Sequence, residues 1–176
     1  MAHYLVSGAA GFIAASVISQ LLDADHTVVG VDNLNQAYDV RMKEYRLGRL
    51  LSRAGFTFHR TDISDRAAVL SQGEVYQQNY QGVINLAARA GVRQSLEDPW
   101  VYVDTNMTGT LNLLEVCRRQ GIPKFILAST SSIYGANAPL PTPETAESDH
   151  PLQPYAASKK GAEVMAYVYH TLYGVD

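Results

Sequence analysis

The chain has 176 residues, 47% of them hydrophobic, which is enough length and apolar content for one domain with a buried core. Its 14 basic and 17 acidic residues give a net charge of −3 without any run of Lys or Arg, so we expect no nucleic-acid partner and no membrane surface. The single cysteine, Cys117, cannot form an internal disulfide, and the N-terminus has neither a charged segment nor a long apolar stretch. These features favour a cytoplasmic location, with Cys117 a spectator thiol in a helix.

The first predicted elements are a strand, a glycine turn and a helix. An apolar run over residues 3–7 leads directly into Gly8 and Gly11, and a helical pattern continues through Ile18. Glycines allow a tight bend and the approach of a phosphate, while the free N–H groups at a helix start attract an anion. Ala14 stands at the third small position of this turn, where only close packing of the helix on the strand is needed.

The second predicted strand, over residues 27–31, ends in Asp32, about 20 residues beyond the glycine turn. A carboxylate at that spacing would accept the hydroxyls of an adenosine ribose and would repel a 2′-phosphate. The combination of strand, turn, helix, strand and acid favours a dinucleotide site that prefers NAD to NADP. The alternative for Asp32 is a plain turn residue beside Asn33.

The third predicted strand reaches the same edge of the sheet. A charged helix over 39–54 precedes this strand, which covers 56–60 and runs into Asp62 and Ile63. Ligands of a doubly wound sheet meet the carboxyl ends of the strands, so these two residues are expected near the adenine. Asp62 could equally be a helix cap, because a short helix is expected over 65–72.

Two further strands and a long helix complete the predicted sheet. A compact apolar strand over 82–86 is followed by small residues at 87–91, which would leave room for a pyrophosphate and a ribose or would simply allow close helix packing. A helix is expected from Pro99 to Gly121, and a fifth strand over 124–128.

Four hydroxyl residues, 129–132, leave the carboxyl end of the fifth strand. Either they form a solvated turn, or one of their hydroxyl groups points into the cleft and donates a hydrogen bond to a reacting oxygen. The segment 136–154 is too rich in proline for a regular element, so we expect a surface loop that returns the chain to the active face.

The last predicted helix, from Tyr155 to Gly174, carries a candidate general acid/base. Tyr155 and Lys159 are four positions apart, so a helix places them on one face. A phenol titrates near pH ~10, and a neighbouring ammonium favours its phenolate. This spacing is also common on amphipathic helices, so the pair gains weight only from the other motifs.

Together these motifs resemble those of the extended short-chain dehydrogenase/reductases that act on nucleotide sugars. The matching segments are spread over nearly the whole chain, at residues 8–14, 31–35, 62–63, 86–88, 129–135 and 155–159. Within the family the chain looks most like the UDP-glucuronate 4-epimerases, through Asp32-Asn33-Leu34-Asn35, Ala90-Gly91-Val92-Arg93 and Tyr155-Ala-Ala-Ser-Lys159. The UDP-glucose 4-epimerases share much of this pattern.

The resemblance implies an α/β fold with a doubly wound parallel sheet (Rossmann fold) and NAD as the cofactor. Residues 1–176 would form the NAD-binding domain, in which Thr130 is the catalytic Ser/Thr, Tyr155 the acid/base and Lys159 its partner. The cofactor contacts predicted from the turn, the acid and the resemblance are Gly8, Gly11, Phe12, Ile13, Asp32, Asn33, Asn35, Asp62, Ile63, Leu86, Ala87, Ala88, Thr105, Tyr155 and Lys159. No metal ligands are expected.

The implied reaction is the 4-epimerisation of a UDP-sugar through a 4-keto intermediate. Related dehydratases carry Asp-Glu where this chain has Ser131-Ser132, and related decarboxylases carry Glu at the second position, so epimerisation is favoured over both alternatives. Chains of the family continue beyond the position of Asp176 into a substrate domain, which is absent here. A truncated NAD-binding fragment or pseudoenzyme is therefore a further alternative, and a short chain of this kind should bind NAD weakly and turn over no sugar. We expect a homodimer at full length, paired through the helices that begin at Pro99 and Tyr155.

Overall fold

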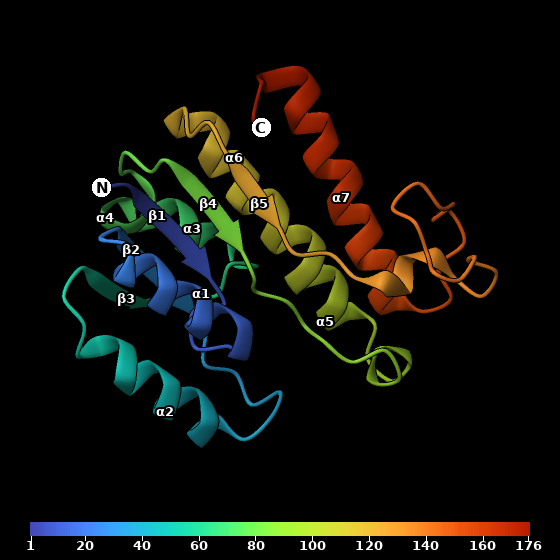
Figure 1. Cartoon of the computed structure of the whole chain (residues 1–176), viewed down its shortest axis with the longest axis horizontal. Coiled ribbons are helices and arrows are strands. Elements are labelled where there is room, and N and C mark those ends of the chain that lie inside the picture. The colour runs from blue at the N-terminus through green and yellow to red at the C-terminus, as the bar shows by residue number, and fades with distance from the viewer.

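The computed structural model describes residues 1–176 and contains one parallel five-stranded sheet with helices on both faces (Figure 1). The strand order is β3-β2-β1-β4-β5. The strands are β1 (His3–Ser7), β2 (Thr27–Asp32), β3 (Phe56–Arg60), β4 (Gly82–Asn85) and β5 (Phe125–Leu127). All pairings are parallel, and the chain moves outward from β1 in both directions, which confirms the predicted doubly wound sheet.

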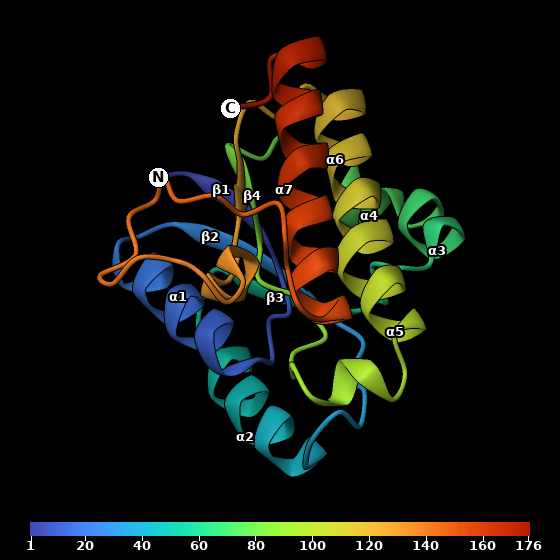
Figure 2. The same cartoon turned by 90° about the vertical axis from the view of Figure 1, so that its right-hand side faces the viewer.

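The helices follow the predicted alternation with strands. They are α1 (Phe12–Asp23), α2 (Val40–Leu51), α3 (Arg66–Ser71), α4 (Gly73–Tyr76), α5 (Trp100–Tyr102), α6 (Gly109–Gln120) and α7 (Pro154–Tyr173), with 3-10 turns η1 (Gln94–Leu96) and η3 (Ser131–Tyr134). Helix α1 packs beside α2, whereas α7 lies along α6 with its axis close to parallel (Figure 2). None of the helices is both long enough and apolar enough to span a bilayer.

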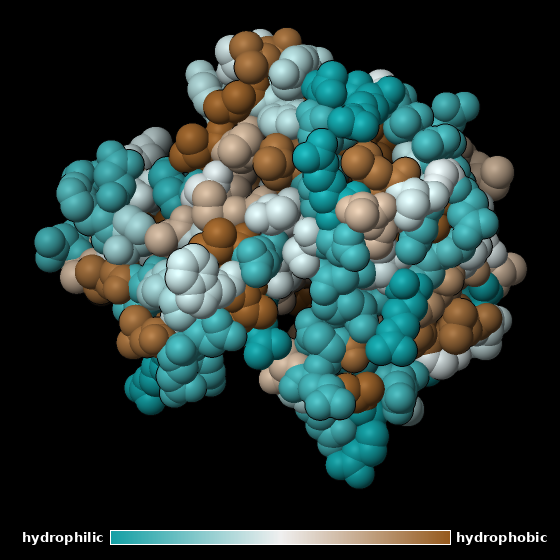
Figure 3. All heavy atoms as spheres, turned by 180° about the vertical axis from the view of Figure 1, so that it is seen from behind, coloured by the Kyte–Doolittle hydropathy of each residue, from teal (hydrophilic) through white to brown (hydrophobic).

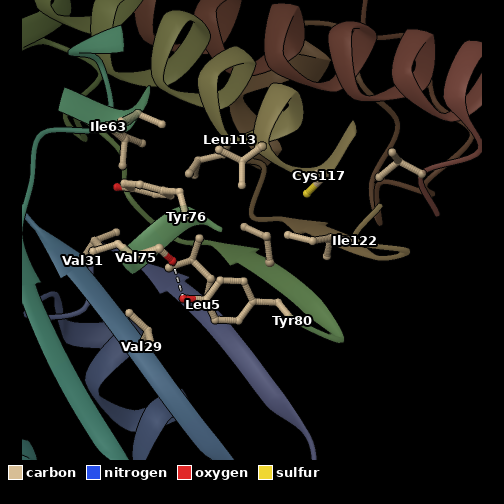
Figure 4. Close-up of a cluster of buried hydrophobic side chains, with 14 residues drawn as sticks. Leu5, Val29, Val31, Ile63, Val75, Tyr76, Tyr80, Leu113, Cys117 and Ile122 are labelled. Atoms are coloured by element: carbon tan, nitrogen blue, oxygen red, sulfur yellow. Dashed lines mark hydrogen bonds between the residues drawn. The ribbon is translucent and has the colours of Figure 1, made fainter. Parts of the chain in front are cut away.

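Two apolar cores form because successive side chains of a strand point to opposite faces of the sheet. On β1, Leu5 belongs to the core beneath α6, and Val6 belongs to the core beneath α1. Leu113 and Cys117 of α6 close the first core, and the Tyr80 hydroxyl there donates a 2.6 Å hydrogen bond to the Val75 carbonyl (Figure 4). Since both faces of the sheet are covered, the central strands β1, β2 and β4 are mostly buried.

The helix expected over 99–121 is not a continuous α-helix, and this prediction is wrong in its middle part. Residues Val103–Thr108 form a π-helix, η2, between α5 and α6. The side chain of Asn106 in this segment is fully buried and bonds to the backbone of Arg89 and to Ser158. The spacing of apolar residues along the chain does not predict such long-range contacts. Short π-helical segments of this kind often occur at functional sites.

The predicted helix ends and loop agree with the structure. Gly121 and Gly174 cap α6 and α7 in the left-handed conformation, with φ of 65° and 69°. Residues 136–154 contain no strand and no helix before Pro154. After α7 the chain returns to the outer edge of β5, where the Phe125 N–H donates to the Asp176 carbonyl at 2.7 Å.

Candidate cofactor and active site

The carboxyl ends of β1, β2, β3 and β4 border a cleft of about 160 Å³. Viewed from behind, the molecular surface is hollowed between the lobe that carries α2 and the lobe that carries α5 (Figure 3). Among the residues predicted to contact a cofactor, the cleft is lined by Gly8, Gly11, Asp32, Asn33, Asn35, Asp62, Ile63, Leu86, Ala87, Ala88 and Thr105. Thus the structure brings together most of the predicted cofactor residues, which come from five separate segments of the chain.

The glycine turn is shaped by close backbone contacts. Gly8 has a φ of +71°, and a Cβ added there would lie 2.8 Å from the Ala87 nitrogen. A Cβ on Gly11 would lie 2.9 Å from the Gly8 carbonyl oxygen. No side chain caps the start of α1, so its first N–H groups have no side-chain acceptor. The turn therefore fits the pyrophosphate of a dinucleotide, which needs close backbone approach and N–H donors.

Asp32 takes part in a turn and also lines the cleft, so the two interpretations of this residue are compatible. Its Oδ1 accepts the Leu34 N–H at 2.7 Å and its Oδ2 accepts the Ala10 N–H at 3.2 Å. The residue is 7% exposed. Oδ2 still has a lone pair for a further donor such as a ribose hydroxyl, whereas Oδ1 also lies 3.5 Å from the Lys43 ammonium.

Asp62 lies on the neighbouring strand end and does not cap the following helix. The cap of α3 is Asp65, whose side chain accepts the Ala68 N–H. The Asn33 amide instead donates to Asp62 at 2.8 Å, and Ser64 donates to it through both its N–H and its hydroxyl. Burial opposes the ionisation of Asp62, but these hydrogen bonds outweigh it and lower the pKa of the carboxyl below its usual range.

Tyr155 and Lys159 lie on the first turns of α7, outside the lining of the cleft. Lys159 is only 2% exposed, and burial lowers the pKa of its ammonium, although Glu163 opposes this shift. The ring of Tyr155 is half-buried and meets the ring of Tyr102 edge to face, with centroids 6.1 Å apart. Tyr102 is itself fixed by a hydrogen bond from its hydroxyl to the Ala90 carbonyl, so it holds the Tyr155 ring on one side.

Thr130 comes directly before η3, the 3-10 turn that packs against α7. It caps η3, and its hydroxyl oxygen accepts the Ser132 N–H at 3.2 Å. Phe12 and Ile13 are also predicted cofactor residues that do not line the cleft, and they are 74% and 61% exposed. Both residues belong to the first turn of α1, directly after Gly11.

The family model described as GDP-mannose 4,6 dehydratase matches residues 5–176. The chain belongs to this family of extended short-chain dehydrogenase/reductases. A UDP-glucuronate 4-epimerase of Thermodesulfobacterium geofontis is 53% identical to it over 176 residues, which are 100% of this chain and 54% of that protein. A probable UDP-glucuronate 4-epimerase of Rhizobium meliloti is 44% identical over 173 residues, covering 98% of this chain and 50% of that protein.

Solved structures of the same family share the fold of this chain. The crystal structure of UDP-glucuronic acid 4-epimerase from Bacillus cereus, in complex with UDP-glucuronic acid and NAD, has a TM-score of 0.88 and 33% sequence identity. The match covers 98% of this chain and 54% of that one. A UDP-glucose 4-epimerase from Thermotoga maritima gives a TM-score of 0.84 at 32% identity, with 98% and 52% covered. The chain spans about half the length of these relatives.

In this member of the family, Asn106 joins the parts of the site, a role not predicted from the sequence. Its side-chain oxygen accepts the Arg89 N–H at 2.8 Å, and its amide donates to the Ser158 hydroxyl at 2.9 Å. The Ser158 hydroxyl in turn donates to the Tyr155 carbonyl at 2.7 Å. An amide in the middle of an otherwise apolar helical pattern was the available signal, because a buried amide must find partners.

Sequence reasoning also missed several residues that line the cleft, which are Val31, Ala37, Tyr38, Lys43, Thr61 and Ala90. Lys43 is the one that carries a charge. It is 5% exposed, and its Nζ lies 3.5 Å from Oδ1 of Asp32. The available signal was its spacing, because Lys43 is four positions before Leu47 and so lies on the buried face of α2, but only the fold shows that this face meets the cleft.

Proposed function

We propose that this chain forms the cofactor-binding and catalytic part of an NAD-dependent UDP-sugar 4-epimerase, and that its substrates are UDP-glucuronate and UDP-galacturonate. The observation that supports the proposal is that Tyr155 and the buried Lys159 are one turn apart on α7, which packs against the η2 segment that contributes Thr105 to the cleft. The names of the relatives described above support the choice of sugar.

The residues of the cleft would hold NAD by complementary chemistry. The turn at Gly8 and Gly11 would bind the pyrophosphate, and Asp32 would bind the adenosine ribose. Asp62 would lie beside the adenine. When bound, NAD would accept a hydride from C4 of the sugar and return it to the opposite face, which inverts that carbon through a 4-keto sugar.

The proton transfer and the hydrogen bonding at the C4 oxygen would be carried out by Tyr155, Lys159 and Thr130. Tyr155 would take the proton of the 4-hydroxyl and later give it back, with Lys159 one helical turn away on α7 as its partner. Thr130 accepts the Ser132 N–H through its oxygen, so its own hydroxyl hydrogen is free to donate to the sugar oxygen. Epimerisation needs no further acid, and Ser131 and Ser132 supply none beside Thr130.

The test is the conversion of UDP-glucuronate into UDP-galacturonate by the full-length protein, followed by chromatography of the UDP-sugars. Tyr155→Phe should retain NAD, because the ring still packs against Tyr102, and should lose about a thousandfold in turnover, because the base is gone. Tyr167→Phe is the matched control, since Tyr167 lies on the same helix and is 70% exposed.

Four outcomes would contradict the proposal. An active Tyr155→Phe enzyme would remove the assigned base. Equal losses in the Tyr155 and Tyr167 variants would indicate damage to α7 and not to the chemistry. A native protein that binds NAD but converts no UDP-sugar would favour a non-catalytic module, and release of a dehydrated or decarboxylated sugar would favour the other reactions of the family.

A further inference from the structure

We infer that Lys43 is a second determinant of dinucleotide recognition and that the choice between NAD and NADP rests on the Asp32–Lys43 pair, not on Asp32 alone. In this arrangement the carboxylate excludes a 2′-phosphate, while the cation that could bind this phosphate is already in place. The inference rests on the proposed binding of NAD.

Lys43 is held over the ribose end of the cleft by three neighbours. Its Nζ lies 3.1 Å from Oδ1 of Asn35 and 3.5 Å from Oδ1 of Asp32, and it stands 5.3 Å from the centre of the Tyr38 ring. The side chains of Lys43 and Asp32 are each 6% exposed. All four residues line the cleft. An ammonium this deeply buried is stable only because it is paired, and the pair fixes its position.

The hydrogen-bonding capacity of the pair leaves one donor for a ligand. An ammonium has three N–H donors, of which one reaches Asn35 and one points to the Asp32 carboxylate. Asp32 is further held by the N–H groups of Leu34 and Ala10, so it cannot turn away from the cleft. A ribose hydroxyl bound to Asp32 would therefore lie beside the ammonium and could accept its remaining hydrogen.

The charges of the pair set the cost of an added 2′-phosphate. With Asp32 ionised, the two side chains together are neutral, so the repulsion of a 2′-phosphate by Asp32 is partly offset by Lys43. If Asp32 loses its charge, the Lys43 ammonium becomes an unpaired phosphate donor at the same place. A single isosteric change at Asp32 should then favour NADP without any new arginine.

Arg46 is the alternative cation and provides the matched control. Its guanidinium donates to the Tyr38 hydroxyl at 3.1 Å and stacks 5.6 Å from the centre of the Phe12 ring. It does not line the cleft. If Lys43 is the phosphate donor, removing Arg46 should leave the dinucleotide preference unchanged.

The experiment measures dissociation constants for NAD and NADP by calorimetry on the full-length protein and compares their ratio within each variant. Asp32→Asn should improve NADP relative to NAD by about ten- to a hundredfold, the value of one charge-assisted hydrogen bond. The double variant Asp32→Asn with Lys43→Met should lose this gain, whereas Asp32→Asn with Arg46→Gln should keep it. Because each ratio is taken within one variant, a general loss of affinity cancels.

The single variant Lys43→Met gives an independent answer should Asp32→Asn fail to fold. In the otherwise native protein it should weaken NADP binding more than NAD binding, because Asp32 then repels the phosphate without an offset. An unchanged ratio in Lys43→Met, or a gain that depends on Arg46, would overturn the inference while leaving NAD binding intact. A native protein that binds neither dinucleotide would instead overturn the proposed function.

Discussion

The two hydrogen-bonding roles of the Thr130 hydroxyl can be separated by substitution. Its oxygen accepts the Ser132 N–H, and its hydrogen remains for the substrate oxygen. Thr130→Ala should reduce turnover about ten- to a hundredfold, because it removes one hydrogen bond to the developing charge, whereas Thr130→Ser should be mild.

The measurement is kcat for UDP-sugar epimerisation by the full-length protein, with Ser129→Ala as the control. Ser129 is the exposed neighbour that shares the run of hydroxyl residues. A larger loss in Ser129→Ala than in Thr130→Ala would mean that the donor in this run is Ser129.

Cys117 is the packed spectator thiol that its helical position predicts. It is fully buried in the core beneath α6, and burial raises the pKa of the thiol to about 12. The thiolate is therefore negligible near neutral pH, and the residue contributes packing without reactivity.

At the scale of elements, Glu115 joins α6 to α7. Its carboxylate accepts hydrogen bonds from Arg118 at 2.7 Å and from the Tyr169 hydroxyl of α7 at 2.6 Å. The hydrogen bond from Arg118 first, and then that from Tyr169, lowers the pKa of Glu115 to about 2. A depressed folded-state pKa means that the stabilisation is present above the unfolded-state pKa and is lost as the pH falls toward 2.

Glu115→Gln should therefore lower the free energy of unfolding at pH 7 by about 1 kcal/mol, a value reduced by the partial exposure of the site. The difference from the native protein should shrink as the pH falls below about 4.5, the ordinary range of a glutamate. Urea unfolding at several pH values tests this. Glu44→Gln, a change at an exposed residue of α2, should show no such pH dependence. If the difference in free energy of unfolding between Glu115→Gln and the native protein stayed constant down to pH 3, the ionic contribution would be refuted.

At the scale of the whole molecule, an apolar stripe on α7 lacks a partner. Val164, Val168 and Leu172 are spaced by one helical turn and are 52%, 39% and 65% exposed. Trp100 of α5 is 76% exposed. Hydrophobic atoms also gather at the upper left of Figure 3, the side on which α7 lies. An exposed patch of this kind marks an interaction surface, so we predict that the full-length protein is a homodimer paired through α5, α6 and α7.

Light scattering behind a sizing column tests the prediction of a dimer. Val168→Glu should convert the dimer into a monomer, because it places an unpaired charge at the centre of the stripe. Leu152→Glu is the control, since Leu152 is also exposed, at 59%, but lies in the loop before α7. A native protein that is a monodisperse monomer, or a dimer that withstands Val168→Glu, would contradict the assignment of this surface.

The elements and the family could be predicted from the sequence because their signals are local. The short apolar run of β1, the glycines at 8 and 11, and the acid at the end of β2 each follow from backbone geometry or from neighbouring residues. The predicted doubly wound sheet is confirmed, and the family is the one that the motifs indicated. The roles of Thr130, Tyr155 and Lys159, and the division into domains, stay predictions.

Only the tertiary structure decided which polar groups meet in the cleft and around the first turn of α7. Asn106 reaches Ser158, which is 52 positions away, and Lys43 meets Asp32 across a turn that the charged pattern of α2 does not reveal. The π-helical segment η2 likewise depends on tertiary contacts, because its buried Asn106 side chain forms hydrogen bonds with other parts of the chain. Local patterns determine which elements form, because their energy comes from neighbours along the chain, whereas buried polar pairs depend on how those elements pack.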